Sequence, residues 1–491
     1  MADKPRLKKR LLGGALLGAA TTGCALTPDP VQPQMIDELS QQETYLGAVS
    51  NEAGQPQMLS WWSRIGGSEL DDLVTVLRAQ SFTLKEANLQ AEQALQSAKI
   101  ARGQRLPSLT ALGDVSTARA PDFAGDFSWS EAYSAGLIFD FNADIFGGLR
   151  ATERSAKLNA LASQLSVQAT EQREIAILAK NWVSAITLQR RLDLAKRTAE
   201  SFRSTYELTD QRYTGGSTTA SASDVQIALQ NLDTALSDIP QIETDLTNQL
   251  LILDEQLARS PGQTEETFQG GVEPLSPVSL PIGRPANLLA NRPDVAASEL
   301  RYLAALEDVG AARANLYPAI SLSASLTFQA DTPGDIFDWD EYIASLANSI
   351  TAPVFQGGRL KAQIQIEQAR ATELATAFAR TMLAAVVDVE IALSDLDGLK
   401  RQRDLLQNAF DTALVSNELA QGRYRQGLAS ILSVLETQRS LDVAEQNLIL
   451  ADQAIANAHI DLFLSLGGEW TARDEISIAQ SSPEFDGKGA R

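Results

Sequence analysis

The sequence predicts a mostly α-helical chain with a smaller β part, assembled from two copies of one structural unit. Two observations predict the duplication and the helices. Short segments recur in the second half at a nearly constant distance, and long stretches carry apolar residues at alternating steps of three and four. A third observation predicts the β part, because four segments of roughly ten residues alternate apolar with small polar side chains.

The duplication is carried by three pairs of matched segments. RGQRLPSL at 102–109 returns as RANLYPAI at 313–320, which is a shift of 211 residues. FGGLRA at 146–151 returns as QGGRLKA at 356–362, and RYTGG at 212–216 returns as RYRQG at 423–427. Each half then has the same order of helix, strand pair, very long helix, turn and long helix. Three matches at one spacing indicate a tandem duplication.

The helical segments are too long for a globular domain. Residues 147–212 contain no proline and predict one helix, roughly 100 Å long at about 1.5 Å per residue. In the second half, a heptad-like apolar series begins at Phe378, with Arg403 as its one polar interruption, and a second series runs from Val434 to Leu462. Such a narrow apolar seam favours sideways packing against neighbouring helices. These helices are too polar to lie in lipid and are expected to project through water.

The four alternating segments are 109–117, 133–141, 320–328 and 342–351. They are typical of transmembrane β-strands with one apolar face, but an ordinary soluble hairpin half-buried on the helices has the same pattern. Four strands cannot close into a barrel, and an open sheet edge in lipid leaves backbone groups without partners. If the strands span a membrane, several chains share one barrel. Two copies give eight strands and a filled interior, whereas three give twelve strands and a lumen, most simply as a trimer.

The N-terminus predicts export and a lipid anchor. Residues 1–10 are basic, an apolar run follows, and this run is shorter than the roughly 20 residues of a spanning helix. The next residues end in Thr-Gly-Cys, which resembles a bacterial lipobox, although Thr21 stands where leucine is usual. Cys24, the only cysteine, is therefore predicted to carry a covalent lipid, and an ordinary signal with an incidental cysteine is the alternative.

Composition argues against several classes of protein. The formal charge is −21, and removal of residues 1–23, with five basic and one acidic residue, leaves −25. An acidic chain without a later basic cluster argues against nucleic acid as a partner. The one histidine, His459, lies in a helical apolar pattern and is expected to be structural. No phosphate loop, nucleophile elbow or His/carboxylate cluster occurs, so we expect no enzyme, no metal and no cofactor beyond the lipid at Cys24.

Residues 280–325 closely resemble the signature of outer membrane factors of the OprM/TolC type, the exit ducts of tripartite efflux pumps, and above all their lipoprotein branch. WWSRIGGSELDDLV at 61–74, both Arg-Tyr-x-x-Gly turns and SLGGEW at 465–470 agree with it. The resemblance implies a homotrimer with a twelve-stranded β-barrel in the outer membrane, continuous with a long α-helical barrel that crosses the periplasm and bears an equatorial girdle. It implies passive export of small molecules, with a periplasmic adaptor (membrane fusion protein) and an inner-membrane transporter of the RND type. A type I protein-secretion duct and a non-conducting periplasmic coiled-coil scaffold are the alternatives.

Pattern and resemblance together divide the chain into six parts. They are a signal peptide (1–23), an anchored segment with part of the girdle (24–66), the first repeat (67–260, with strands about 108–118 and 129–141), an equatorial linker (261–290), the second repeat (291–470, with strands about 319–329 and 342–353 and helices about 358–420 and 430–466), and a disordered tail (471–491). The hairpin loops 118–129 and 329–341 are expected outside the cell. The second loop is acidic (Asp331, Asp335, Asp338, Asp340, Glu341), and we expect it to be solvated rather than to bind calcium.

The resemblance also implies two sets of functional residues. Adaptor binding is expected at the two helix-turn-helix tips, through Arg212, Tyr213 and Gly216 in the first and Arg423, Tyr424, Gly427, Leu428 and Ala429 in the second. The alternative is that these residues only shape the turns. A gate is expected beyond the tips, where Ser433 replaces an aspartate of related ducts, leaving Asp224 and Glu436 as the acidic positions. Alternatively, both carboxylates are solvated residues that favour the helix dipole.

Overall fold

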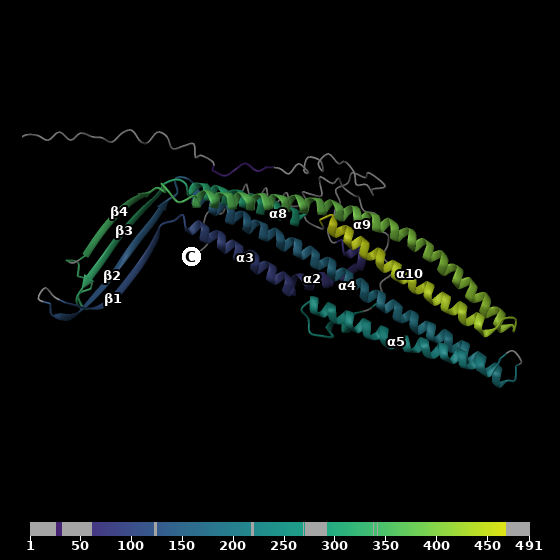
Figure 1. Cartoon of the computed structure of the whole chain (residues 1–491). Coiled ribbons are helices and arrows are strands. Elements are labelled where there is room, and N and C mark those ends of the chain that lie inside the picture. Colours follow the sequence, from purple (N-terminus) through teal and green to yellow (C-terminus); the bar gives the residue numbers. More distant parts are fainter. Residues whose placement is uncertain are drawn as a thin grey trace, which may run out of the picture. The chain divides into compact units, whose positions relative to one another are not determined.

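The computed structural model describes residues 26–31, 61–121, 125–217, 220–268, 270, 292–336, 338–340 and 342–467 (Figure 1). The elements are α2 (Ser63–Gln80), α3 (Phe82–Gly103), β1 (Ser108–Pro121), β2 (Phe127–Ala143), α4 (Gly148–Thr214), α5 (Ala222–Gln256), α6 (Gln263–Thr267), α8 (Pro293–Ala314), β3 (Ala319–Ala330), β4 (Tyr342–Thr351), α9 (Arg359–Arg425) and α10 (Ile431–Ser465). Cys24, most of the girdle segments and the tail 471–491 lie outside the described residues.

The two halves contain helices of equal length. α3 and α8 have 22 residues each, α4 and α9 have 67, and α5 and α10 have 35. α9 ends at Arg425, five residues beyond the predicted end, because the chain leaves the helix only where Gly427 takes a positive φ. Among the described residues, no helix is both long enough and apolar enough to span a bilayer.

The chain divides into two compact units, and the first contains all four strands. It comprises residues 1–31, 93–160 and 300–375. The strands form one antiparallel sheet in the order β1-β2-β3-β4. Its first hairpin is longer than predicted, because residues 118–121 of β1 pair with 127–130 of β2. The connecting loop is therefore 122–126 rather than 118–129.

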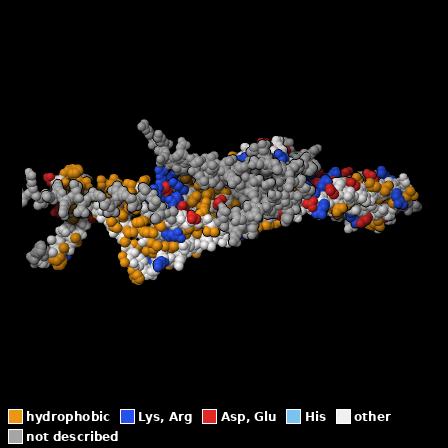
Figure 2. All heavy atoms as spheres, turned by 90° about the horizontal axis from the view of Figure 1, so that it is seen from above, with side chains coloured by type: hydrophobic (Ala, Val, Ile, Leu, Met, Phe, Trp, Pro, Cys, Tyr) orange, Lys and Arg blue, Asp and Glu red, His pale blue; other side chains and the backbone are white. Residues whose placement is uncertain are grey.

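The edge strands of the sheet are little covered within the single chain, whereas the inner strand β3 is half-buried along most of its length. Every residue of β4 is exposed, and β1 has one half-buried residue. Large apolar side chains are exposed on β1, β2 and β4, including Leu109, Trp129, Leu346 and Ile350. Figure 2 shows hydrophobic side chains gathered over this part of the molecule. This exposure differs from a soluble hairpin half-buried on helices, the alternative that the sequence pattern left open.

The helical part of the first unit has its own small core. Tyr302, Leu306 and Val309 of α8 pack with Ala371 of α9. The segment 26–31 lies against α8 and is held by polar contacts. The Val31 N–H donates to the Tyr302 hydroxyl at 2.9 Å, and Arg313 Nη1 donates to the Leu26 carbonyl at 2.9 Å. The first described residues after the predicted lipid site are thus fixed to a helix that leads into β3.

The second unit comprises residues 32–92, 161–299 and 376–491, and the elements described in it are helices. Its main core joins α2, α4, α5, α9 and α10, and Trp61 stacks on Phe463 with ring centroids 5.1 Å apart. The apolar series of α9 is buried from Phe378 to Leu396 and becomes half-buried from Leu399 onward. A second core near the helix-turn-helix ends contains Phe202, Leu232, Tyr424 and Leu435.

Candidate gate and adaptor-binding tips

The two predicted tips have the same backbone geometry. Gly216 and Gly427 both take φ of +74°, a conformation that glycine adopts without steric cost. In each turn the glycine N–H bonds the carbonyl three residues back, at 3.1 Å and 2.9 Å. The N–H of the following residue bonds the carbonyl five residues back, at 3.0 Å and 2.8 Å. This pattern satisfies the last carbonyls of α4 and α9 and reverses the chain sharply.

Two of the predicted tip residues contact each other across the tips. Arg212 Nη1 donates to the Tyr424 carbonyl at 2.8 Å, and Nη2 donates to the Arg425 carbonyl at 2.9 Å. The guanidinium carbon lies 4.5 Å from the Tyr424 ring centroid, within the range of a cation–π contact. Tyr424 is buried, and its hydroxyl lies 3.0 Å from Thr209 Oγ1. Arg212 and Tyr424 therefore link the end of α4 to the end of α9.

The other tip residues are more accessible. Tyr213 is 47% exposed and Leu428 is 66% exposed. Gly216, Gly427 and Arg423 are also exposed, whereas Ala429 is half-buried against the second core. The exposed members form a surface that a partner could contact without unfolding the turns.

Asp224, one of the predicted gate carboxylates, belongs to a capping box at the start of α5. The Asp224 N–H donates to Ser221 Oγ at 3.2 Å, and the Ser221 N–H donates back to Asp224 Oδ2 at 2.9 Å. This reciprocal pair satisfies two donors that a helix start leaves without partners. Asp224 thus has a local structural role whatever it contributes to a gate.

Glu436 and Ser433 lie on the exposed side of the first turns of α10. The Glu436 side chain is 77% exposed and stands 3.6 Å from Arg439 Nη1, one helical turn away. An exposed pair of this kind contributes little to stability. Within the described residues, Glu436 is therefore free to face a neighbouring chain or a lumen.

A polar seam between α4 and α10 was not predicted. Gln438 Nε2 lies 2.9 Å from both Ser201 Oγ and Thr205 Oγ1, and all three atoms belong to a partly or fully buried network. One turn away, Thr198 donates to Asp442 at 2.7 Å. Hydroxyl residues at 198, 201, 205 and 209 follow a three-and-four spacing, which was the available signal.

Arg403, the predicted polar interruption of the α9 series, has a partner on α10. Its Nε donates to Asp452 Oδ1 at 2.8 Å, and both side chains are partly buried. The polar residue that interrupts the apolar series therefore forms an ion pair between α9 and α10, which follow each other in sequence. Such a charged pair fixes their register more than it adds stability.

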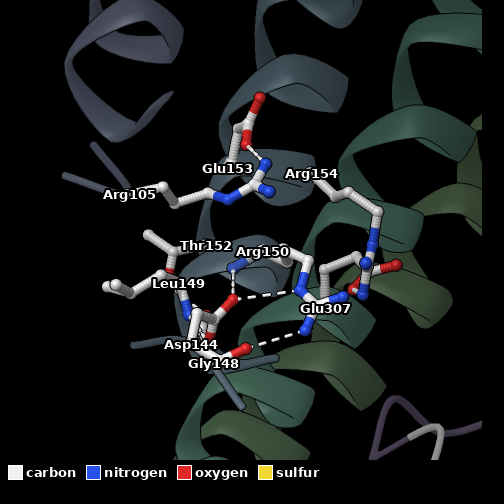
Figure 3. A network of polar contacts seen from close by, with 9 residues as sticks. All are labelled: Arg105, Asp144, Gly148, Leu149, Arg150, Thr152, Glu153, Arg154 and Glu307. Atoms are coloured by element: carbon white, nitrogen blue, oxygen red, sulfur yellow. Dashed lines mark hydrogen bonds and ion pairs between the residues drawn. The ribbon is translucent and has the colours of Figure 1, made fainter. Parts of the chain in front are cut away.

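At the other end of α4, a polar network surrounds the junction with β2 (Figure 3). Asp144 accepts the N–H groups of Leu149 and Arg150 at 3.1 Å and 2.9 Å, so it caps the helix start. The same carboxylate pairs with the Arg150 guanidinium at 3.2 Å. The strand-to-helix junction is thus held by one aspartate that bonds backbone and side chain together.

The next residues of α4 connect this junction to two other segments. Glu153 is buried and paired with Arg105 and with Lys157. Burial alone would raise the pKa of the Glu153 carboxyl, but hydrogen bonds from Lys157 and Arg105 lower it below its usual range. Arg154 pairs with Glu307 of α8 at 2.6 Å, and Thr27 donates to the same carboxylate at 2.9 Å. These pairs hold α3, α4, α8 and the segment 26–31 together.

Arg292 and Asp294, which lie within the segment 280–325 that carries the family resemblance, also have a structural role. Arg292 is bidentate to Asp294, at 3.1 Å and 2.8 Å, and it reaches Asp388 of α9 at 3.1 Å. It further donates to the Ser465 carbonyl at the end of α10 at 3.3 Å. One guanidinium thus joins the start of α8 to α9 and α10.

The described residues contain no group of three His, Cys, Asp or Glu side chains arranged to hold a metal ion, and this includes the described part of the loop 331–341. His459 is buried, and its Nδ1 lies 2.9 Å from the Ile455 carbonyl. Burial lowers the pKa of the imidazole, against the opposing effect of that hydrogen bond. His459 is thus a neutral core residue at neutral pH.

Comparison with known proteins agrees with this architecture. The family model of the outer membrane efflux protein matches residues 73–259 and 285–468. The pyoverdine export outer membrane protein OpmQ of Pseudomonas aeruginosa is 30% identical over 468 residues, which cover 93% of this chain and 95% of OpmQ. The cation efflux system protein CusC of Escherichia coli O6:H1 is 25% identical over 92% of this chain and 97% of CusC.

Solved structures show the same fold. A membrane protein from Pseudomonas aeruginosa superimposes with a TM-score of 0.80 at 27% identity, over 91% of this chain and 98% of that one. The outer-membrane channel OprN also gives 0.80, at 24% identity, over 91% and 100%. OprN is named as an outer-membrane channel, and members of the matched family are outer membrane channel proteins. The chain therefore belongs to the outer membrane efflux protein family and is an outer membrane channel of a tripartite efflux system.

Proposed function

We propose that three copies of the chain close one twelve-stranded barrel in the outer membrane and continue as one helical tunnel. The observation that carries this proposal is the open sheet, whose edge strands β1 and β4 each have one neighbour in the single chain. Backbone groups at such edges need partners inside a bilayer. The four strands have 10 to 17 residues, enough for the 9–11 that a tilted spanning strand needs.

The two halves of the protomer derive from a tandem duplication in this proposal. The equal helix lengths and the matched tip turns support it. Each 67-residue helix is about 100 Å long at 1.5 Å per residue. Packed side by side from three chains, these helices would form a tunnel through the periplasm.

The lipid anchor is Cys24 in this proposal. Its support is the basic and apolar N-terminal sequence and the attachment of residues 26–31 to α8. Cys24→Ala should abolish acyl labelling and slow signal processing, while the apolar strands still insert the barrel. A mature N-terminus at another residue would contradict the anchor without affecting the channel.

The partners are a periplasmic adaptor, bound at the two tips, and an inner-membrane transporter of the RND type. The exposed Tyr213, Arg423 and Leu428 support docking at this end of the helices. The cargo is a small solute in this proposal, since relatives are named for pyoverdine export and for cation efflux. In the closed state, carboxylates of Asp224 and Glu436 from three chains surround the axis.

A planar bilayer tests the duct. The purified full-length chain should have the mass of three copies and should give discrete single-channel currents. A trimer that never conducts, even with its adaptor, would contradict the duct and would support a non-conducting scaffold.

A further inference from the structure

The two faces of the four-stranded sheet differ in charge as well as in polarity. The register places Asp140 of β2 opposite Ser108 of β1 and Ser323 of β3. Ser323 Oγ donates to Asp140 Oδ1 at 2.8 Å, so both side chains project from the same face. On that face, Ser325 Oγ and Ser345 Oγ lie 2.7 Å apart across β3 and β4.

This polar face carries carboxylates and no cation. Its side chains in β1, β2, β3 and β4 are mostly serine, threonine, glutamine, asparagine and alanine, with Leu112, Ile138 and Ile343 as the large apolar exceptions. Within the four described strands, Asp114 and Asp140 are the only charged residues on it. The opposite face carries the large aliphatic and aromatic residues, and its two charged residues, Arg119 and Glu131, lie near the first hairpin.

The apolar face of an outer membrane strand contacts lipid, so the polar face lines the water-filled interior. Asp114 pairs with Ser134, six residues along β2 from Asp140. At about 3.3 Å per residue, the two carboxylates lie about 20 Å apart along the strand direction and therefore at different depths in the barrel. Both are exposed, and the hydrogen bond from Ser323 orients the Asp140 carboxylate.

We infer that Asp114 and Asp140 make the barrel lumen select cationic and neutral solutes over anions. This inference rests on the proposed trimer, in which each aspartate contributes three carboxylates at one level. Rings of one sign of charge attract counterions and exclude ions of their own sign, and the low-dielectric walls strengthen the effect. No Lys or Arg on the polar face of the described strands compensates these charges.

Reversal potentials in a planar bilayer test the inference. The full-length channel is placed in a KCl gradient, and the parent is compared with the double variant Asp114→Asn/Asp140→Asn. Glu131→Gln is the matched control, because it removes a carboxylate from the same strand β2 but from the opposite face. The gate carboxylates Asp224 and Glu436 stay the same in all three proteins, so a difference in reversal potential reports on the charges of the barrel lumen.

The double variant should lower the cation-to-anion permeability ratio at least about twofold near 0.1 M salt, where charges act over about 10 Å. The difference should shrink near 1 M, where the screening length is about 3 Å, and Glu131→Gln should match the parent. An unchanged ratio in the double variant, or an equal fall in Glu131→Gln, would overturn the inference.

If the double variant forms no trimer, Asp114→Asn alone is measured by the same criteria. Absence of currents from the parent trimer would contradict the proposed channel instead.

Discussion

The Arg212 guanidinium at the end of α4 lies 4.5 Å from the ring centroid of Tyr424 at the end of α9 and donates to the Tyr424 carbonyl at 2.8 Å. This contact ties together two turns that are 211 residues apart in sequence. The contact depends on the planar, forked guanidinium of arginine, since its second nitrogen donates to the Arg425 carbonyl at the same time. Parting the two tips would break all of these interactions.

Arg212→Lys should therefore loosen the tips while it keeps the charge. Lysine cannot donate to two carbonyls with a fixed fork or stack a planar group on Tyr424. We expect a higher baseline conductance in single-channel recordings. Arg203→Lys is the control, because Arg203 forms an exposed pair with Glu200 on the same helix. Equal baselines in Arg212→Lys and the parent would show that this contact does not hold the channel closed.

Neutralising Asp224 and Glu436 together should raise baseline conductance or weaken block by multivalent cations, because a closed ring of like charges is stabilised by a bound cation. The capping role of Asp224 requires a separate control. Ser221→Ala removes the hydroxyl of the capping box, at a cost of about 0.5–2 kcal/mol, and leaves both carboxylates. If Ser221→Ala reproduces the effect, the cap rather than the charge is responsible. If neither variant changes the traces, the gate lies elsewhere.

A bulky residue at Ala429 should weaken adaptor binding. Ala429 is half-buried beside the exposed Leu428, so tryptophan at 429 would change the surface of the second tip. We expect reduced adaptor cross-linking and reduced efflux with normal trimer abundance. Intact cross-linking and efflux would indicate that the tip residues only shape the turn.

Gly310→Ala should detach the segment 26–31 from α8. A Cβ at Gly310 would lie 2.5 Å from Thr27 Oγ1 and 3.2 Å from the Thr27 backbone, which is too close. Gly398→Ala on α9 is the matched control, because nothing lies within 4 Å of its Cβ position. There, alanine should stabilise the helix by about 1 kcal/mol. Limited proteolysis near residue 31 should accelerate only in Gly310→Ala, and equal rates in the two variants would contradict the clamp.

Asp442 should make the α4–α10 seam more stable in mild acid. Burial raises the pKa of its carboxyl, although hydrogen bonds from Thr198 and Gln446 oppose the shift. A carboxyl whose pKa is higher in the folded state than in the unfolded state stabilises the fold fully at pH values below the unfolded pKa. This stabilisation is lost as the pH rises through the folded pKa. Hydrogen exchange of the seam should therefore slow as pH falls from about 7 toward about 4, the usual pKa of an aspartate, after correction for intrinsic rates. Asp442→Asn should lose this pH dependence, and retention of it would contradict the assignment.

Much of the fold could be predicted because long elements repeat a simple pattern. The 67-residue α4 was expected at 147–212 and runs from 148 to 214, since an uninterrupted helix needs only periodicity and the absence of proline. The strands were also found by their alternation. Their pairing extended the first hairpin beyond the prediction, because residues 118–121 gain backbone partners that no local pattern shows.

The tip contacts could not be predicted from local pattern. Arg212 and Tyr424 were recognised by a family motif, but their contact depends on how α4 and α9 pack, which periodicity does not encode. The seam of Ser201, Thr205 and Gln438 was missed for a related reason. Polar residues at helical spacing usually indicate a solvated face, and only the position of α10 makes this one an interface.

The central claim, that three chains close one barrel by pairing β1 of each copy with β4 of the next, is tested most directly by cross-linking. Thr110 of β1 and Ser349 of β4 lie on the polar face, each two residues from the helical end of its strand. Cysteines at these two positions in the Cys24→Ala background, treated with a short bis-maleimide in membranes, should give products of one, two and three chains and none larger. A series that stops at two chains, or one that continues past three, would contradict the twelve-stranded barrel.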